Sequence, residues 1–277
     1  MKLIKPSFVI IKQESGLDGM YKQIELAGRT CYKSEDKITE NSAKEFVDRM
    51  IKSGHGAMLE HGTVYLALDM SSRHVYFKYC WNKFSVANSI GKAERNTWKG
   101  FITTNFRVLV ENGWLDDLQY ICEPTEYHEK RITVKFITDQ GILREFTRHR
   151  VFSFAVESTR YCNYSKDKFG NEITFIEPDW LGDTREINSE VYNGAYEIFW
   201  SAMEEAEAYY MILLENGFKP QQARNVLPLA TKCDLVMTGF VNDWKHFFEL
   251  RDAISAHPQA RELAKPLHEE FIKRNYI

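Results

Sequence analysis

Three arginines gather with hydroxyl and amide side chains in one short stretch, residues 148–165, RHRVFSFAVESTRYCNYS. Arg148 and Arg150 flank His149, and Arg160 follows ten residues after Arg150. Guanidinium groups repel one another unless anions lie between them, and they bind phosphate bidentately, so this stretch predicts a site for a phosphorylated ligand. A solvated basic loop is the alternative interpretation. The stretch also holds four aromatic residues, which argues against a purely solvated segment.

The rest of the chain shows no arrangement in which side chains alone would carry out a reaction. No Ser or Cys has a neighbouring base in the pattern of a nucleophilic triad, and neither a P-loop nor a dinucleotide-binding fingerprint occurs. His55, Glu60 and His61 are close in sequence, but they do not match HExxH, so no metal site is predicted. The side chains suit the binding of anions and of a planar polar ring, with a cofactor supplying the chemistry.

The composition is that of an ordinary globular protein. The chain has 277 residues, of which 44% are hydrophobic and 27% charged, and its net charge is −3. A slightly acidic chain is not drawn to nucleic acid as a whole, so no dedicated nucleic-acid binding is expected and an anion site must be a local cluster. No apolar run approaches the roughly 20 residues of a membrane helix, and the N-terminus lacks a signal-peptide cleavage site. The five cysteines form no CxxC pair, which favours a cytoplasmic location.

The elements that must position these side chains can be predicted from periodicity. Residues 131–139, RITVKFITD, alternate as a strand, and the short helix predicted after them leads directly to Arg148. Apolar residues three and four apart predict that the longest helix covers residues 187–216. A capping box of Ser42 and Glu45 predicts another helix. The predicted strands are 8–11, 63–70, 131–139, 172–178 and 233–242, and the predicted helices are 17–28, 42–53, 96–113, 187–216, a helix from Pro220, a helix bearing His246 and Arg251, and 258–275.

A family resemblance adds to this interpretation. Over residues 148–161, the series RHR, two residues, Ser, four residues, Ser, one residue and Arg-Tyr resembles the signature of the flavin-dependent thymidylate synthases. Further segments on both sides, in the same order, resemble landmarks of that family. They are ELAGRTCYKS before residue 35, GHGAMLEHG with His55, QQARNVLPLA with Arg224, and a C-terminal series with Asn242, His246, Arg251, His257 and Gln259.

The resemblance implies methylation of dUMP to dTMP, with methylenetetrahydrofolate as carbon donor and NADPH reducing a bound FAD. It implies that Arg251 is the catalytic residue, which stabilises negative charge as N3 of the uracil ring ionises. The implied substrate contacts are Glu145, Arg148, Ser158, Thr159, Arg160, Arg224 and Arg251. The implied flavin contacts are His55, Arg148, His149, Arg150, Val151, Glu157, Asn242 and His246. Because His246 and Arg251 are five residues apart on one helix, they are expected to lie about 140° apart and to face different ligands.

The resemblance also implies the fold and the assembly. Residues 1–277 are expected to form a single α/β (α+β) domain, with a central, mostly antiparallel sheet packed by long helices. Such domains assemble as homotetramers with active sites shared between subunits. Residues 71–130 depart from the short family members and are expected to form a helical insertion, whose function the sequence does not reveal.

Three positions differ from the family pattern. Glu145 stands where relatives often have Gln, and its carboxylate would repel a nucleotide phosphate unless Arg148 or Arg160 neutralises it. Ala155 and Val156 replace residues that are commonly polar, so one hydrogen bond to the flavin or nucleotide is expected to be lost. The positive anchors remain.

Two other functions stay open. The chain could be a non-catalytic nucleotide- or RNA-binding protein that uses its arginines and aromatic rings for phosphate binding and stacking. It could also be a related flavoenzyme that modifies another pyrimidine nucleotide. Bound flavin separates the first alternative from the favoured function, and product analysis separates the second.

Overall fold

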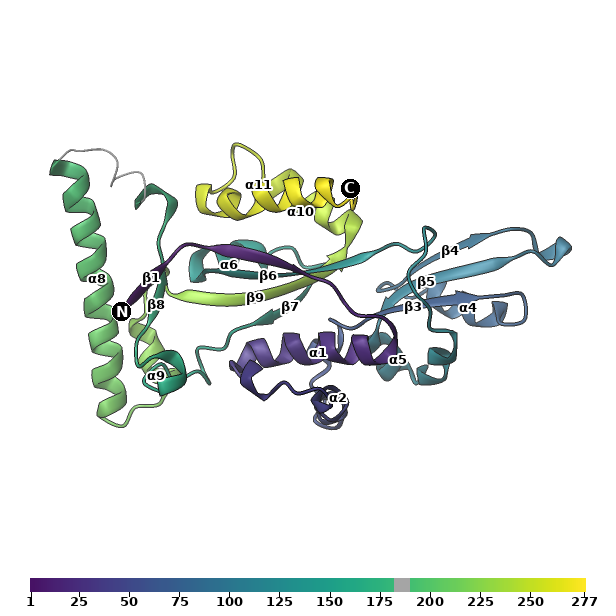
Figure 1. Ribbon diagram of the computed structural model, residues 1–277, viewed down its shortest axis with the longest axis horizontal. Coiled ribbons are helices and arrows are strands. Elements are labelled where there is room, and N and C mark those ends of the chain that lie inside the picture. Colours follow the sequence, from purple (N-terminus) through teal and green to yellow (C-terminus); the bar gives the residue numbers. More distant parts are fainter. Residues whose placement is uncertain (182–189) are drawn as a thin grey trace.

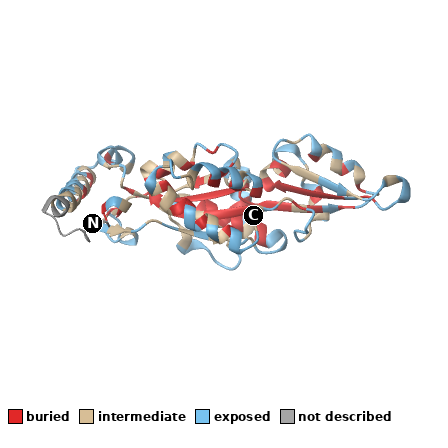
Figure 2. Cartoon of the chain, turned by 90° about the horizontal axis from the view of Figure 1, so that it is seen from above, coloured by how far each residue is buried: buried red, intermediate tan, exposed pale blue. Residues whose placement is uncertain are grey.

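The computed structural model describes residues 1–181 and 190–277. The molecule is elongated, with a central sheet between two groups of helices, a smaller sheet at one end and the long helix α8 (Glu190–Glu215) at the other (Figure 1). Buried residues concentrate in the central strands and in the helix faces turned toward them (Figure 2). The expected fold class, helices packed on antiparallel sheets, is confirmed.

The central sheet has four strands, and each pair of neighbours is antiparallel. Their order is β2 (Ser7–Ile11), β6 (Arg131–Asp139), β9 (Lys232–Phe240) and β7 (Ser153–Val156). The first three were predicted, β6 from its alternation and β2 and β9 from their runs of apolar residues. The strand β7 was not, since it lies inside the motif stretch and is four residues long.

One face of this sheet carries the main apolar core. Val134 and Phe136 of β6, with Leu235 and Met237 of β9, point toward three helices on that side. Trp244 is fully buried there, and its indole Nε1–H donates to the carbonyl oxygen of Ile132 over 3.1 Å. The helices are α6 (Gln140–Phe146), α10 (Val241–Arg251) and α11 (Pro258–Lys273), all of which were expected.

The opposite face of the same sheet is polar, because the alternate positions of β6 and β9 carry charged side chains. Lys135 pairs in register with Val236, and Asp234 and Lys232 lie on the same side of β9 as Val236. The helix α1 (Gly16–Tyr32) covers this face, where Ala27 packs against Val236. It extends four residues beyond the predicted end at residue 28. This polar face receives the motif residues that follow β7.

A helical layer continues from α1 into α2 (Ser42–Lys52) and α3 (Gly56–Leu59). Gly28 allows α1 and α2 to approach, because a Cβ at this position would lie 2.4 Å from Cζ of Phe46. The predicted capping box of Ser42 is wrong. Asn41 is the N-cap, and the Ser42 hydroxyl donates instead to Oε2 of Glu25 over 2.8 Å. The Ser42 hydroxyl thus bonds to the Glu25 carboxylate of α1 and does not cap α2.

The insertion is not helical throughout, which corrects the expectation. It contains α4 (Arg73–Cys80), β4 (Val86–Ile90), β5 (Lys99–Asn105) and α5 (Phe106–Asn112). With β3 (Thr63–Leu68), these strands form an antiparallel sheet in the order β3-β5-β4. The predicted helix over 96–113 fails in its first half, since Ile102, Thr103 and Thr104 are β-branched and suit a strand. Its second half is α5, which ends at Gly113 with φ +69°.

The other end of the molecule holds a parallel pair, β1 (Lys2–Ile4) with β8 (Thr174–Ile176), beside α8. Residues 187–189, where the longest helix was predicted to begin, lie outside the described residues. The helix predicted from Pro220 is a single turn, α9 (Pro220–Ala223), followed by the 3-10 turn Arg224–Val226. No helix in the described ranges is long and apolar enough to cross a membrane.

Candidate functional site

The guanidinium of Arg251 is held against the start of the motif stretch. Its Nε donates to Nε2 of His149 over 3.0 Å, its Nη1 donates to Oε2 of Glu145 over 2.8 Å, and its Nη2 donates to the carbonyl oxygen of Glu145 over 2.8 Å. Arg251 ends α10, Glu145 lies on α6, and His149 follows α6 in a tight turn. Residues more than 100 positions apart in sequence therefore meet.

His149 is neutral in this arrangement. Its side chain is buried, and burial together with the charges of Arg251 and His246 lowers the pKa of His149 to about 4. Since Nε2 accepts a hydrogen bond from Arg251, the ring proton of neutral His149 must lie on Nδ1. The imidazole is thus fixed in one tautomer by the arginine.

The side chains of Arg148, Arg150 and Val151 in this turn point into solvent. Phe152 is buried in the main core and anchors the turn, and its backbone N donates to the carbonyl oxygen of His149 over 3.1 Å. Arg148 is 73% exposed at its side chain, and Val151 is 68% exposed. Arg150 is exposed as well. The sequence thus presents two cations on a rigid base, where they can bind an anionic ligand.

His246 lies on α10, one turn before Arg251, and both residues flank His149. The ring centroids of His149 and His246 are 6.3 Å apart. One imidazole therefore lies next to both residues, and the expectation that His246 and Arg251 face different ligands stays a prediction. Asn242, at the start of α10, is exposed, and its backbone N donates to Oε1 of Glu129 over 3.3 Å.

The later motif residues form a second group on the far side of β7. Nη1 of Arg224 donates to the hydroxyl of Thr159 over 3.2 Å, and Nε of Arg160 donates to Oε1 of Gln221 over 3.1 Å. Ser158 is tied to the end of α1, because its backbone N donates to the carbonyl oxygen of Cys31 over 2.9 Å. Gln221 was not predicted. Its position near Arg224 in the segment QQARNVLPLA could have indicated that Gln221 belongs to the site.

The four arginines expected in one site fall into these two groups. Arg148 lies just before β7 in sequence, and Arg251 packs near the start of that strand. Arg160 and Arg224 lie beyond the other end of β7. Four extended residues span roughly 13 Å, so β7 holds the two groups apart. A single chain thus brings the arginines together in pairs, but not all four around one point.

A pocket of about 920 Å³ adjoins the second group and is lined by His55. Its cations outnumber its single acidic side chain, and aromatic and thioether groups form part of its wall. The Tyr32 ring, which also lines it, contacts the Tyr161 ring with centroids 5.5 Å apart, so the pocket and the motif loop are continuous. The lining residues are Arg29, Tyr32, Ser34, Asp36, Lys37, Phe46, Arg49, Met50, Lys52, Ser53, His55 and Lys168. Such a basic, partly aromatic pocket suits a planar ligand that carries phosphate.

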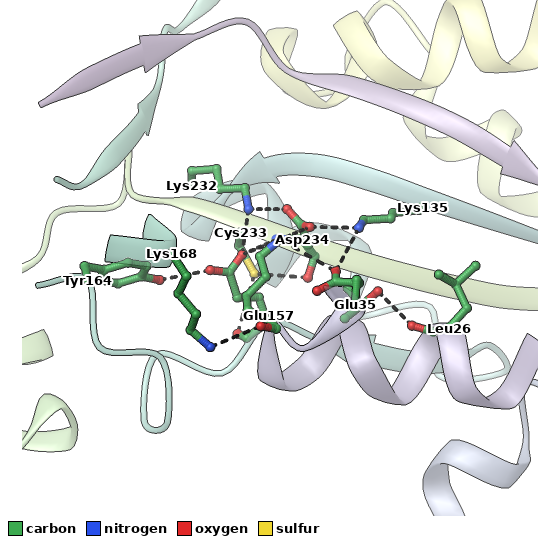
Figure 3. A network of polar contacts seen from close by, with 11 residues as sticks. Leu26, Glu35, Lys135, Glu157, Tyr164, Lys168, Lys232, Cys233 and Asp234 are labelled. Carbon is green, nitrogen blue, oxygen red and sulfur yellow. Dashed lines mark hydrogen bonds and ion pairs between the residues drawn. The ribbon is translucent and has the colours of Figure 1, made fainter. Parts of the chain in front are cut away.

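The expected flavin contact of Glu157 is not supported by the structure. Its carboxylate is buried and already paired: Oε2 accepts from Nζ of Lys232 over 2.8 Å and from the backbone N of Asp234 over 3.1 Å, and Oε1 accepts from the Tyr164 hydroxyl over 3.2 Å. Figure 3 shows this carboxylate inside a network of ion pairs on the polar face of the central sheet. Its contacts indicate a structural role.

The network is an unexpected feature of the molecule. Nζ of Lys135 lies 3.0 Å from Oδ2 of Asp234, which also pairs with Lys33, and the other Asp234 oxygen pairs with Lys232. Burial would raise the pKa of Asp234, but the three lysines outweigh it and hold that pKa well below its usual range. The sequence signal that could have indicated this network is the presence of charged residues within the otherwise apolar strand segments VKF and KCDLV.

No metal site was predicted, and within residues 1–181 and 190–277 no group of three His, Cys, Asp or Glu side chains is placed to hold a metal ion. His61 is fully buried, and its Nδ1 lies 2.8 Å from the Thr238 hydroxyl. Glu60 pairs with Arg107 over 2.6 Å. These two residues of the GHGAMLEHG segment are held by structural contacts.

The fold and these two basic groups define an α/β protein equipped to bind anionic ligands. A sequence model of one family, described as thymidylate synthase complementing protein (Thy1), matches residues 15–80 and 124–274. These ranges make up well over half of the chain, so the chain belongs to that family. Residues 81–123, between the matched ranges, contain β4, β5 and α5.

Curated relatives agree with the family assignment. The chain is 28% identical over 158 residues to a flavin-dependent thymidylate synthase of Haloarcula marismortui, covering 53% of this chain and 64% of the relative. It is 32% identical over 133 residues to one of Pyrococcus abyssi, covering 48% and 50%. The match thus spans half to just under two thirds of these relatives. A solved UMP/dUMP methylase, PolB from Streptomyces cacaoi, is 18% identical with a TM-score of 0.47, over 99% of this chain and 93% of that chain.

Proposed function

We propose that the chain is a flavin-dependent thymidylate synthase, an enzyme that methylates dUMP to dTMP. The observation that carries this proposal is the fixed contact of Arg251 with His149 and Glu145, next to the exposed Arg148. Family membership and the flavin-dependent thymidylate synthases among the relatives support it. The substrate is dUMP, and the co-substrates are methylenetetrahydrofolate and NADPH.

In this proposal Arg251 acts on the uracil ring. A largely buried guanidinium whose direction is set by three hydrogen-bond acceptors is preorganised, so it stabilises negative charge at the ring without first reorienting. His149 supports it as a neutral acceptor and adds no positive charge. Arg148 is exposed beside Glu145 and would hold an anionic part of the substrate.

The second group supplies the remaining substrate contacts. Arg224 and Arg160 would bind the phosphate of dUMP, with Ser158 and Thr159 adding neutral donors. Because these residues lie beyond the far end of β7 from Arg251, we propose that each active site combines the first group of one subunit with the second group of another. A homotetramer with shared sites meets this requirement.

The residues present fit FAD. The His55 pocket offers a basic lining for a diphosphate and aromatic walls for a ring, within a volume that is ordinary for a cofactor site. We propose that His55, Arg148, His149, Arg150, Val151, Asn242 and His246 hold FAD in the assembled site. When bound, the flavin supplies the hydride for the reductive methylation after reduction by NADPH. We further propose that the enzyme is cytoplasmic and that residues 1–277 act as one domain.

The absorbance spectrum of the purified protein, with and without dUMP, tests this function. We expect a flavin spectrum that dUMP perturbs, and release of tritium from dUMP labelled at C5 when NADPH and folate are present. A colourless protein that FAD cannot reconstitute would contradict the proposal. Salt-sensitive binding of single-stranded RNA without flavin would favour the non-catalytic alternative.

A further inference from the structure

Glu145 accepts hydrogen bonds from Arg251, the residue that is proposed to act on the substrate. Its side chain accepts from Nη1 of Arg251, and its carbonyl oxygen accepts from Nη2, both over 2.8 Å. The Arg251 side chain is 14% exposed and that of Glu145 is 30% exposed, so water screens this pair only in part. All three guanidinium nitrogens of Arg251 are engaged, the third by His149.

The same carboxylate also faces Arg148. Its Oε1 lies 3.7 Å from Nη1 of Arg148, while its Oε2 bonds to Arg251. Glu145 thus lies between two cations that are proposed to hold an anionic nucleotide. The three side chains together carry a net charge of +1, because two positive charges oppose one negative charge. With Gln at this position, the same cluster would carry +2.

We propose that Glu145 is a positioning residue that competes with the anionic nucleotide for Arg148 and Arg251, and so weakens its binding while it orients Arg251. This inference rests on the proposed function. A ligand carrying negative charge must share or displace the carboxylate, whereas a neutral ligand need not. Glu145 therefore tunes the affinity of the site for charge, and does not merely support the fold.

The structure leaves space for such an exchange. Glu145 also lines a pocket of about 570 Å³ between α6, the start of α11 and the Trp180 segment. His257 and Gln259 line the same pocket, and Gln259 Nε2 donates to Oδ2 of Asp139 over 3.1 Å. A rotation of the carboxylate away from the arginines would carry it toward this pocket.

Calorimetric titration of the purified flavoprotein tests the inference. dUMP, a dianion, and deoxyuridine, its neutral nucleoside, are titrated into the wild type and into Glu145→Gln. We expect Glu145→Gln to bind dUMP about tenfold more tightly, because the carboxylate no longer competes with the anionic nucleotide for Arg148 and Arg251. Deoxyuridine affinity should change by less than twofold. Equal changes for both ligands, or weaker dUMP binding, would overturn the inference.

Steady-state kinetics provide a second readout. Because the carboxylate also directs Arg251, Glu145→Gln should lower both kcat and KM. A general loss of folded enzyme would lower kcat and leave KM unchanged. Glu145→Asp keeps the charge, and it should keep the wild-type ratio of dUMP to deoxyuridine affinity even if Glu145→Gln is unstable. A changed ratio in Glu145→Asp would also contradict the inference.

Glu249→Gln is the matched control. Glu249 is exposed on α10, and it lies 3.2 Å from His246 without contacting either arginine. Its removal takes away the same charge near the site and should alter dUMP affinity by less than twofold; a tenfold gain here would overturn the specific role of Glu145. If the wild type binds neither flavin nor dUMP, the proposed function fails, and this inference with it. Normal dUMP binding by the wild type with no gain in Glu145→Gln defeats this inference alone.

Discussion

Nε of Arg251 donates to Nε2 of His149 over 3.0 Å, although 102 positions separate the two residues in sequence. The contact fixes the direction of the guanidinium and the tautomer of the imidazole together. It requires His149 to be neutral, which agrees with the lowered pKa of His149, about 4. Replacing either residue should therefore alter the position of the other.

Arg251→Lys should lower kcat by a factor of about a hundred or more, with little loss of stability. A lysine keeps the charge, but it cannot donate to His149 and to both Glu145 acceptors in fixed directions. The measurement is tritium release from labelled dUMP, with a thermal melt as the control for folding. Activity within threefold of the wild type would show that the fixed hydrogen bonds of the Arg251 guanidinium are not needed.

The free energy of unfolding should fall as the pH is lowered from 6.5 to 5. Burial lowers the pKa of His61 to about 3 and, with neighbouring charges, that of His149 to about 4. In the unfolded chain both would bind protons near pH 6.5, so the unfolded state binds more protons in this range and acid favours it. Each histidine contributes up to about 1.4 kcal/mol per pH unit.

Urea unfolding between pH 6.5 and 5 measures this dependence. His61→Gln should be less stable at pH 7, because the contact with Thr238 is lost, but its stability should vary less steeply with pH. An unchanged slope in this variant would show that His61 is not a source of the acid sensitivity.

Asp234→Asn should destabilise the fold by about 3–5 kcal/mol, because it leaves partly buried lysines without their shared partner. Adding Lys135→Met to this variant should restore part of the loss, since the orphaned charge is then removed. Chemical denaturation of both single variants and the double variant gives the coupling energy. Strict additivity would mean that Lys135 and Asp234 do not interact.

The insertion should unfold together with the rest of the chain. Ile102 and Phe106 share a buried cluster with Met20 and Ile24 of α1 and with Phe46 of α2. This shared core makes a separately melting module unfavourable. Calorimetry should show one cooperative transition, and two well-separated transitions would identify residues 71–130 as an independent unit.

Three of the four central strands could be predicted from their apolar residues, and 131–139, the one that alternates, was placed without error. The strand at 99–105 was missed because its apolar residues lie next to those of α5, so the pair resembled one amphipathic helix. The family resemblance implied one site for Arg251 and the motif residues, but it did not predict the contact of Arg251 with the motif turn. Periodicity cannot indicate a contact between residues so far apart.

Two features of the site could not be derived from local sequence. Glu157 stands inside the motif, yet its carboxylate faces Lys232 and Asp234, because strand pairing between β7 and β9 places them together. The separation of Arg251 from Arg224 depends on where β7 runs. That path is a tertiary property, and only the folded chain shows that the arginines form two groups.

The central claim is that one active site uses Arg251 and Arg224 from different subunits, and mixing two inactive variants tests it most directly. Arg251→Ala and Arg224→Ala, with different tags, are coexpressed and the mixed oligomers are assayed for tritium release from dUMP. If sites are shared, random mixing regenerates some sites with both arginines, and about a quarter of wild-type activity should return. No recovery in mixed oligomers that bind FAD would contradict the account, because every site would then belong to a single chain.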